Sequence, residues 1–149
     1  MLKKLVSLII IFLLSPLLLI ISVVIVFYDG TPIFFKQKRL GKNNKTFLIY
    51  KFRTMKKDTP NIASHDLKSS ESFLIKSGKT IRKYSLDELP QLINIFLGDM
   101  NFIGPRPALF NQKDLINARN IHGIDTLKPG LTGWAQINGR DNLGISEKV

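Results

Sequence analysis

The residues from Leu5 to Tyr28 form a run of 24 residues without a charged side chain. As an α-helix this run would be about 36 Å long, which is enough to cross the hydrocarbon core of a bilayer. Such length and composition are typical of a membrane segment. We therefore predict a membrane helix over residues 1–28 and a separate polar domain over residues 29–149.

Three interpretations of the apolar segment compete. A cleaved signal peptide is disfavoured, because the run is longer than the roughly 7–15 apolar residues of a signal sequence and ends in bulky side chains. The second interpretation is a straight spanning helix, and the third is a helix that bends and leaves by the face it entered. Pro16 favours a bend, since it has no N–H for the Phe12 carbonyl, and the Ser15 hydroxyl is placed to bond to polar groups that the break leaves free.

The charges on both sides of the apolar segment also help to distinguish a straight spanning helix from a bent one. Lys3 and Lys4 precede it and a stronger basic cluster follows it, and positive charge marks the cytoplasmic side of a membrane helix. A spanning helix would have to move one basic end across the membrane, whereas a bent, re-entrant helix keeps both ends in the cytoplasm. Proline is also common in fully spanning helices, so the residues alone leave the two topologies open.

The polar domain is predicted to have an α+β fold. It is expected to be small and mainly helical, with one short β-hairpin, and to occupy residues 29–149. The patterns predict strands at Ile33–Phe35 and Thr46–Phe52 with a turn at Gly41–Asn44, a loop at Thr59–Ser72, a short helix at Lys113–Asn120 and a turn-rich loop at Lys128–Gly133.

The chain is strongly basic, with 22 Lys and Arg against 11 Asp and Glu and a net charge of +11. This balance points to an anionic partner. Nine of the basic residues lie between Lys36 and Lys57, with no acid among them. Directly after a membrane segment, such a cluster either binds anionic lipid or serves only as an orientation signal. We expect no nucleic acid as a partner, because no nucleic-acid motif accompanies the charge. The chain has no cysteine, which excludes disulfides and thiol chemistry.

Two adjacent acids, Asp87 and Glu88, are the strongest candidates for chemistry. Ser85 and Glu88 have the spacing of a helix capping box, whereas Pro90 suits the first residue of a helix, and the sequence does not decide between these starts. In either case the positive end of a helix would favour the ionised carboxylates. Paired carboxylates suit Mg²⁺ bound together with substrate phosphates, and a carboxylate can also attack phosphorus. The structural alternative is that both acids only start a helix.

Arg106 stands between two prolines in the sequence Gly-Pro-Arg-Pro. The prolines disfavour helix and stiffen the backbone, so the guanidinium is expected to project from an extended loop. A guanidinium presented in this way suits bidentate contact with a phosphate.

Several long motifs, taken together, resemble the bacterial sugar transferase family, the monotopic phosphoglycosyl transferases that start glycan assembly. The motifs are Gln37–Gly41, Lys51–Met55, Ser85–Leu92, Gly98–Pro107 and Lys128–Arg140. They occur in the family's order, and the similarity extends from Leu2 to about Arg140.

The resemblance implies a reaction and a set of site residues. The catalytic dyad would be Asp87 and Glu88. Asp87 would attack the β-phosphate of a UDP-sugar, expel UMP and hold the phosphosugar covalently, and Glu88 would help to bind Mg²⁺. Membrane polyprenol (undecaprenyl) phosphate would then accept the sugar 1-phosphate. The residues expected to bind substrate phosphates are Arg82, Arg106, Lys51 and Arg53, and the stretch from Trp134 to Arg140 is expected to help shape the nucleotide or sugar pocket.

The resemblance also implies a setting for this reaction. The Ser15-Pro16 break would correspond to the family's re-entrant helix, which places the domain on the cytoplasmic face of the bacterial inner membrane. The product would start exopolysaccharide, capsule, O-antigen or glycoprotein glycan assembly, and a homo-oligomer or other glycan-assembly enzymes are the further partners considered. Family members continue beyond the Asn-Gly-Arg motif, so the C-terminal end of the domain is expected to be missing. A truncated, non-catalytic membrane-anchored remnant or interaction module is the alternative function, and the identity of the sugar is not predicted.

Overall fold

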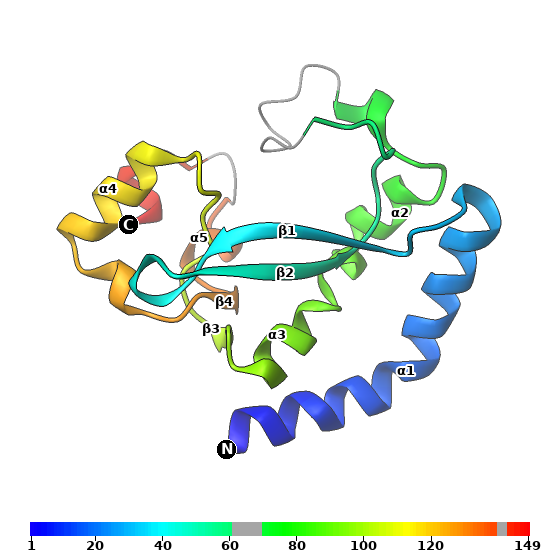
Figure 1. The fold of residues 1–149 in the computed structure, drawn as a ribbon, viewed down its shortest axis with the longest axis horizontal. Coiled ribbons are helices and arrows are strands. Elements are labelled where there is room, and N and C mark those ends of the chain that lie inside the picture. The colour runs from blue at the N-terminus through cyan, green and yellow to red at the C-terminus, as the bar shows by residue number, and fades with distance from the viewer. Residues whose placement is uncertain (61–69, 140–142) are drawn as a thin grey trace.

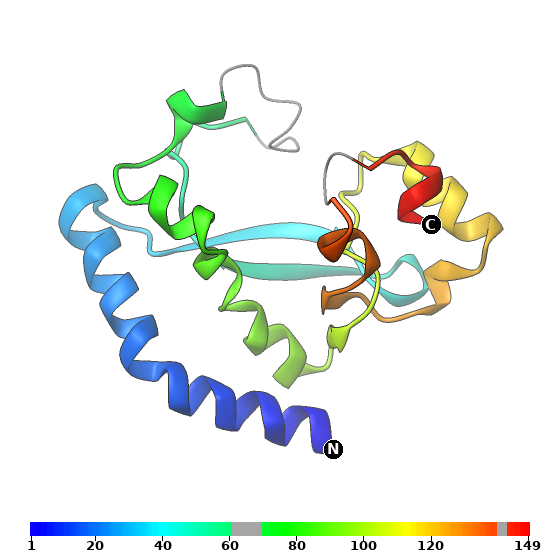
Figure 2. The same cartoon turned by 180° about the vertical axis from the view of Figure 1, so that it is seen from behind.

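The computed structural model describes residues 1–60, 70–139 and 143–149, and within them the fold is α+β as predicted. Most of the predicted Thr59–Ser72 loop, as well as Arg140, lies outside the described residues. A long N-terminal helix runs along one side of a small domain built from short helices and two small sheets (Figures 1 and 2).

Helix α1 (Leu2–Asp29) is continuous but bends near its middle (Figure 1). Pro16 lies inside the helix. The Ser15 hydroxyl donates a hydrogen bond to the Phe12 carbonyl over 2.7 Å. This bond replaces the one that Pro16 cannot donate, and it confirms the role predicted for Ser15.

Both halves of α1 pack against the domain. The first half contributes the partly buried Ile10, Ile11 and Leu14 to a core cluster formed by Ile49, Leu92, Ile95 and Met100. The second half contributes Leu18, Ile21 and Ile25 to another cluster with Phe52, Ile75 and Ile81. The opposite face of α1 is an exposed apolar surface, with Phe12 and Phe27 more than three quarters exposed. By length and composition this helix is able to cross a membrane.

Strands β1 (Phe34–Leu40) and β2 (Thr46–Phe52) form the predicted antiparallel hairpin, with Phe34 opposite Phe52. The second strand has the predicted bounds. The first was predicted to end at Phe35 but continues to Leu40, because it pairs with all seven residues of β2 and its last N–H bonds to the Ala108 carbonyl. The turn between them, Lys42–Asn44, is a 3₁₀ turn.

The segment that carries the two acids does not begin a capped α-helix. After α2 (Gly78–Lys83), Ser85 adopts a left-handed conformation and its side chain caps nothing, which overturns the capping-box interpretation. Asp87 and Glu88 lie in a 3₁₀ turn, η3 (Leu86–Glu88), and helix α3 (Gln91–Leu97) starts only after Pro90. Of the two starts left open by the sequence, the one at Pro90 agrees with the structure to within one residue, because Pro90 directly precedes the first helical residue, Gln91.

Helix α3 turns one apolar face towards the core and leaves other apolar side chains exposed. Leu92 and Ile95 are buried in the core cluster, whereas Phe96 is exposed on the surface. The buried face also includes Asn94, whose side chain accepts a hydrogen bond from the Tyr50 N–H and donates one to the Leu48 carbonyl. These two bonds attach α3 to the middle of β2 (Figure 2) and thereby set the position of the η3 turn just before it.

A second, parallel sheet joins two motifs that are far apart in the sequence, and the sequence patterns did not predict it. Strand β3 (Asn101–Ile103) pairs with β4 (Gly130–Thr132). A Cβ atom on Gly104, Gly130 or Gly133 would collide with the neighbouring backbone, so these glycines allow the two segments to touch. Helix α4 (Lys113–Ile121) confirms the predicted helix, and a short helix α5 (Trp134–Ile137) follows β4.

Candidate functional site

Asp87 is buried at the wall of a cavity of 410 Å³. The cavity lies between the hairpin, the residues that follow β2, and the η3 turn. One part of its wall is apolar, with Pro32, Phe34, Phe35, Phe52 and Met55, and six other lining residues are basic. The basic lining residues are Arg39, Lys51, Arg53, Lys56, Lys57 and Arg82. A cavity of this size and composition can hold an anionic molecule that also has an apolar part.

The structure brings most of the predicted site residues together. Lys51 and Arg82, predicted to bind phosphate, line the cavity together with Asp87. Arg106 lies on the other side of the dyad, against Glu88. Arg53 also lines the cavity, but its guanidinium donates to the Asp29 and Gly30 carbonyls at the end of α1. Its contacts in the structure therefore anchor α1 to the hairpin, and its phosphate contact stays a prediction.

The carboxylate of Glu88 is held by cations from two other segments. Lys51 Nζ lies 2.8 Å from Glu88 Oε1, and the two terminal nitrogens of Arg106 lie 3.3 and 3.4 Å from the same oxygen. Burial by itself disfavours the charged form, but Lys51 and Arg106 outweigh it and lower the pKa of Glu88 to about 2. Glu88 is therefore a fixed negative charge.

Asp87 has the opposite environment, although it is the next residue. Burial raises its pKa above the ordinary value, and the neighbouring charge of Glu88 acts in the same direction, against the opposing effects of Lys51 and Arg82. The expectation that a helix terminus would favour both ionised forms is wrong for Asp87, because no long helix begins there and burial dominates. A carboxylate with a raised pKa next to one with a lowered pKa is typical of a reactive site.

The pKa of Lys51 is lowered by its buried position near Glu88 and Arg106. Burial lowers its pKa more than the attraction of Glu88 raises it, and the positive charge of Arg106 lowers the pKa further. A buried ammonium with a lowered pKa is poised to interact strongly with any anion that enters the cavity, because little solvent screens it.

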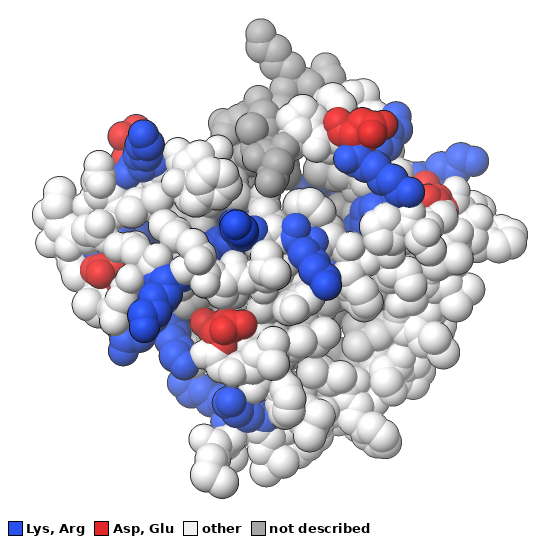
Figure 3. All heavy atoms as spheres, in the orientation of Figure 1, with Lys and Arg blue, Asp and Glu red and all other residues white. Residues whose placement is uncertain are grey.

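Other basic residues of the Lys36–Lys57 cluster do not form a single surface patch. Arg39 lines the cavity and donates to the Pro107 carbonyl, and Lys36 lies over the ring of Tyr50. Sequence reasoning had not singled out Arg39, Lys56 or Lys57 as cavity residues. Their sequence signals were membership of the basic cluster and, for Arg39, a place in the Gln37–Gly41 motif. Figure 3 shows the Lys and Arg side chains of the visible face in several separate places.

The described part of the Trp134–Arg140 stretch does not line this cavity. Trp134 is exposed on helix α5, and its indole ring lies on the surface. The predicted role of this stretch in shaping a nucleotide or sugar pocket therefore stays a prediction, and Arg140 lies outside the described residues.

The described residues contain no group of three or more His, Cys, Asp or Glu side chains that would hold a metal ion by themselves. Two adjacent carboxylates can still bind a metal ion when a substrate supplies further ligands. All the hydrogen bonds to Glu88 from the described residues reach Oε1, which leaves Oε2 for another ligand.

The buried Asp87 and the half-buried Glu88 have pKa values shifted in opposite directions, and both lie beside clustered cations. Such a site is suited to phosphate chemistry. The sequence matches the family described as "Bacterial sugar transferase" over residues 1–149. This chain therefore belongs to the bacterial sugar transferase family. Among its relatives, the sugar transferase EpsL of Bacillus subtilis, itself described as uncharacterized, is 44% identical over 80% of this chain and 57% of EpsL.

Two further relatives have names that state an activity. The UDP-glucose:undecaprenyl-phosphate glucose-1-phosphate transferase of Escherichia coli is 36% identical over 94% of this chain and 31% of that protein. The UDP-N-acetylgalactosamine-undecaprenyl-phosphate N-acetylgalactosaminephosphotransferase of Aeromonas hydrophila is 37% identical over 83% of this chain and 30% of that protein. The chain thus spans between about a third and somewhat more than half of these three relatives.

Proposed function

We propose that this chain transfers a sugar 1-phosphate from a UDP-sugar to membrane polyprenol phosphate and so starts the assembly of a cell-surface glycan. The family and the names of the Escherichia coli and Aeromonas relatives support the class of reaction. The observation that carries the proposal is the buried Asp87 carboxylate on the wall of a basic cavity, next to a second carboxylate whose pKa is shifted in the opposite direction.

In the first half of the reaction, an Asp87 carboxylate oxygen attacks the β-phosphorus of the UDP-sugar. A new oxygen–phosphorus bond forms while the bond from that phosphorus to the bridging oxygen of the diphosphate breaks. UMP leaves with the electron pair of the broken bond, and the sugar phosphate stays on Asp87 as an acyl phosphate. This divides one difficult transfer into two easier ones.

In the second half, a phosphate oxygen of polyprenol phosphate attacks the same phosphorus. The bond to Asp87 breaks, its electrons return to the carboxylate, and polyprenol diphosphate sugar is released. Neither half requires a proton from the protein. Both halves gather negative charge on phosphate oxygens, and Lys51 and Arg82, which line the cavity, would neutralise it.

The environments of the two acids favour Asp87 over Glu88 as the nucleophile. The Glu88 carboxylate is tied to Lys51 and Arg106, which lower its basicity. Asp87 lines the cavity and has a raised pKa, so its ionised form is the more basic and the stronger nucleophile.

We further propose that Mg²⁺ serves as cofactor, bound with the help of Glu88 together with substrate phosphates. Mg²⁺ is usually bound by one or two carboxylates plus phosphates rather than by an all-protein cage. Glu88 fits this role because it stays ionised and its Oε2 accepts no hydrogen bond from the described residues. When bound, the ion would neutralise charge on the leaving phosphate.

The packing of α1 supports a re-entrant helix on the cytoplasmic face of the inner membrane. Residues before and after Pro16 pack against the same polar domain, and the Lys3 ammonium donates to the Asn101 side chain of that domain. A straight spanning helix would pull the domain into the bilayer, at a high cost for its polar groups. The exposed apolar face of α1 would lie in lipid, and the basic cluster would face the cytoplasm.

The covalent intermediate gives a direct test. Protein in membrane vesicles with Mg²⁺ would be mixed with UDP-sugars labelled in the β-phosphate, without added polyprenol phosphate. We expect the wild-type protein to keep label after denaturation and to release UMP, and Asp87→Asn to do neither. Asp114→Asn, on the exposed surface of α4, is the matched control and should behave as wild type. Full UMP release by Asp87→Asn would falsify the assignment of the nucleophile.

A further inference from the structure

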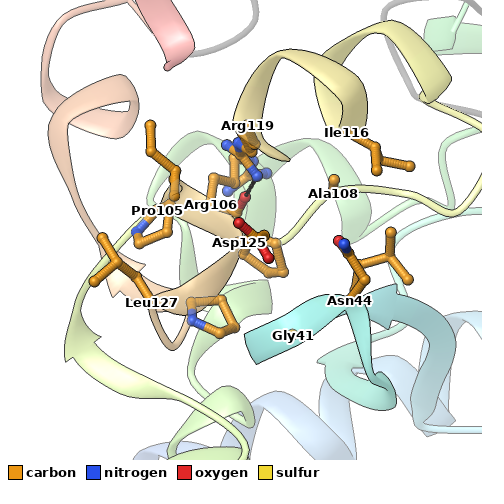
Figure 4. A pocket seen from close by; sticks show the side chains of 13 residues that line it. Gly41, Asn44, Pro105, Arg106, Ala108, Ile116, Arg119, Asp125 and Leu127 are labelled. Carbon is orange, nitrogen blue, oxygen red and sulfur yellow. Dashed lines mark hydrogen bonds between the residues drawn. The ribbon is translucent and has the colours of Figure 1, made fainter. Parts of the chain in front are cut away.

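Arg119 is a buried arginine that contacts the loop carrying Arg106. It lies in the last turn of α4 and is 8% exposed. Burial lowers the pKa of its guanidinium, and none of the described carboxylates forms an ion pair with it. Its Nη1 donates to the Arg106 carbonyl over 2.7 Å (Figure 4), while its Nε has no hydrogen-bond acceptor among the described residues. Burying a charge with so few partners is costly, so its position calls for a physical reason.

The small cavity beside Arg119 does not supply that reason. Its volume is 30 Å³, which leaves room for about one water molecule and none for a substrate. Arg119 therefore acts on the protein itself, and the group that it contacts is the backbone of the Pro105–Pro107 loop.

That loop is held through its carbonyl groups. Pro105 and Pro107 have no N–H to donate, so the loop has few ways to fix itself. The Pro105 carbonyl accepts a hydrogen bond from the Gly130 N–H, the Arg106 carbonyl accepts one from Arg119, and the Pro107 carbonyl accepts one from Arg39. Three elements, β4, α4 and β1, thus each hold one of three successive carbonyls.

The middle carbonyl of the three belongs to Arg106, whose side chain contacts Glu88 in the site. The carbonyl and the side chain of Arg106 leave from the same Cα, so fixing the direction of one restricts the direction of the other. The Arg106 side chain reaches Glu88 from this loop over distances of 3.3 and 3.4 Å. Such contacts are long enough to be lost after a small rotation of the loop.

We propose that Arg119 is a positioning residue, whose hydrogen bond to the Arg106 carbonyl aims the Arg106 guanidinium at Glu88 and at the phosphates of the substrate. Arg119 touches no substrate and acts only through Arg106. The role assigned to Arg106 toward phosphate rests on the proposed transferase function, whereas the orientation of its side chain does not.

A double-mutant cycle on UMP release tests the pathway from Arg119 to Arg106. We expect Arg119→Met to reduce kcat by about 10- to 100-fold, the scale of a misplaced catalytic group. Arg119→Met combined with Arg106→Met should lose no more than Arg106→Met alone, because the positioning residue has nothing left to position. Losses that multiply in the double variant would overturn the proposal. Arg119→Lys keeps the charge and replaces Arg119→Met in the cycle if that variant does not fold.

A matched control separates positioning from general packing. Leu115 lies on the same helix and is as buried as Arg119, but it does not contact the Arg106 carbonyl. Leu115→Ala should lower the thermal midpoint and leave kcat near the wild-type value at temperatures where it is folded. An equal fall of kcat in Leu115→Ala would mean that Arg119 only stabilises α4.

A second measurement is independent of activity. In protein labelled with ¹⁵N-arginine, the Arg106 guanidinium signal is assigned by its loss in Arg106→Met. Arg119→Met should speed the exchange of that signal with water, and Leu115→Ala should not. If the wild-type protein released no UMP but this difference held, the transferase proposal would fail and the positioning would stand. An unchanged Arg106 signal in Arg119→Met, with normal transfer by the wild type, would refute the positioning alone.

Discussion

Replacing Glu88 by Gln removes the one charge that Lys51 and Arg106 share, and the structure predicts how stability should then depend on pH. In the folded protein the pKa of Glu88 falls from 4.5 to about 2. One fifth of the Glu88 side chain is exposed, so after solvent screening we expect this shift to correspond to about 2–3 kcal/mol of folding free energy. The stabilisation is present above pH 4.5, the value in the unfolded chain, and is lost as the pH falls towards 2.

The burial of Lys51 limits how much its ion pair with Glu88 stabilises the fold. Burial lowers the pKa of Lys51 despite its pairing with Glu88, so the pair stabilises the fold by less than the carboxylate shift alone suggests. In Glu88→Gln the lysine loses its counter-charge, and its pKa falls further. Loss of its proton would then relieve part of the cost near neutral pH.

Thermal unfolding in detergent, followed by circular dichroism, measures this difference. Glu88→Gln should unfold about 4–12 °C below the wild type near pH 6, given about 2–4 °C per kcal/mol for a chain of this size. The gap should close as the pH falls from 5 to about 2, because Glu88 of the wild type then becomes neutral as well. Glu147→Gln, on the far C-terminal turn, is the control and should show a small, constant gap. A gap of unchanged size at pH 6 and pH 2.5 would refute the reasoning.

Three further predictions concern chemistry, packing and topology. UMP release should decline on acidification at a pH above 3.8, the ordinary aspartate value, because the pKa of Asp87 is raised. Lys51→Met should move this decline to still higher pH, because Lys51 lowers the pKa of Asp87. A decline at the same pH in Lys51→Met would contradict the assignment of Asp87. Gly130→Ala should lower the thermal midpoint strongly, since its Cβ would strike the backbone at Gly104, while Gly144→Ala, which meets only side chains, should not. Tags placed before Met1 and after Val149 should both be accessible from the cytoplasmic face only, and labelling from opposite faces would rule out the re-entrant topology.

The elements that were predicted correctly from sequence are those whose pattern is local. The membrane-length helix follows from one uninterrupted apolar run, β2 from a short β-rich run next to a turn, and α4 from a short polar helix pattern. The elements that were predicted wrongly or missed are those whose structure depends on contacts with distant segments of the chain. Strand β1 is longer than predicted because β2 and the Ala108 carbonyl supply partners, and the β3–β4 pairing joins residues about thirty positions apart.

The candidate site shows the same division. The adjacent acids and the proline-flanked Arg106 were visible as local motifs, and Lys51 and Arg82 followed from the family resemblance. Arg119 and Arg39 were not found, because an arginine that donates to a distant carbonyl has no local pattern. The capping-box spacing at Ser85 was misleading, since the left-handed conformation of Ser85 puts both acids in a 3₁₀ turn.

The sequence by itself determined that this chain has an apolar helix with a break at Ser15-Pro16, a basic polar domain and a pair of adjacent acids. Only the tertiary structure made the two acids different. Lys51, 37 residues away from Glu88, and Arg106 hold Glu88 ionised, while burial at the cavity wall raises the pKa of Asp87. The physical reason is that a charge is stabilised or destabilised by whatever surrounds it in space, and for Asp87 and Glu88 those surroundings come from distant parts of the chain.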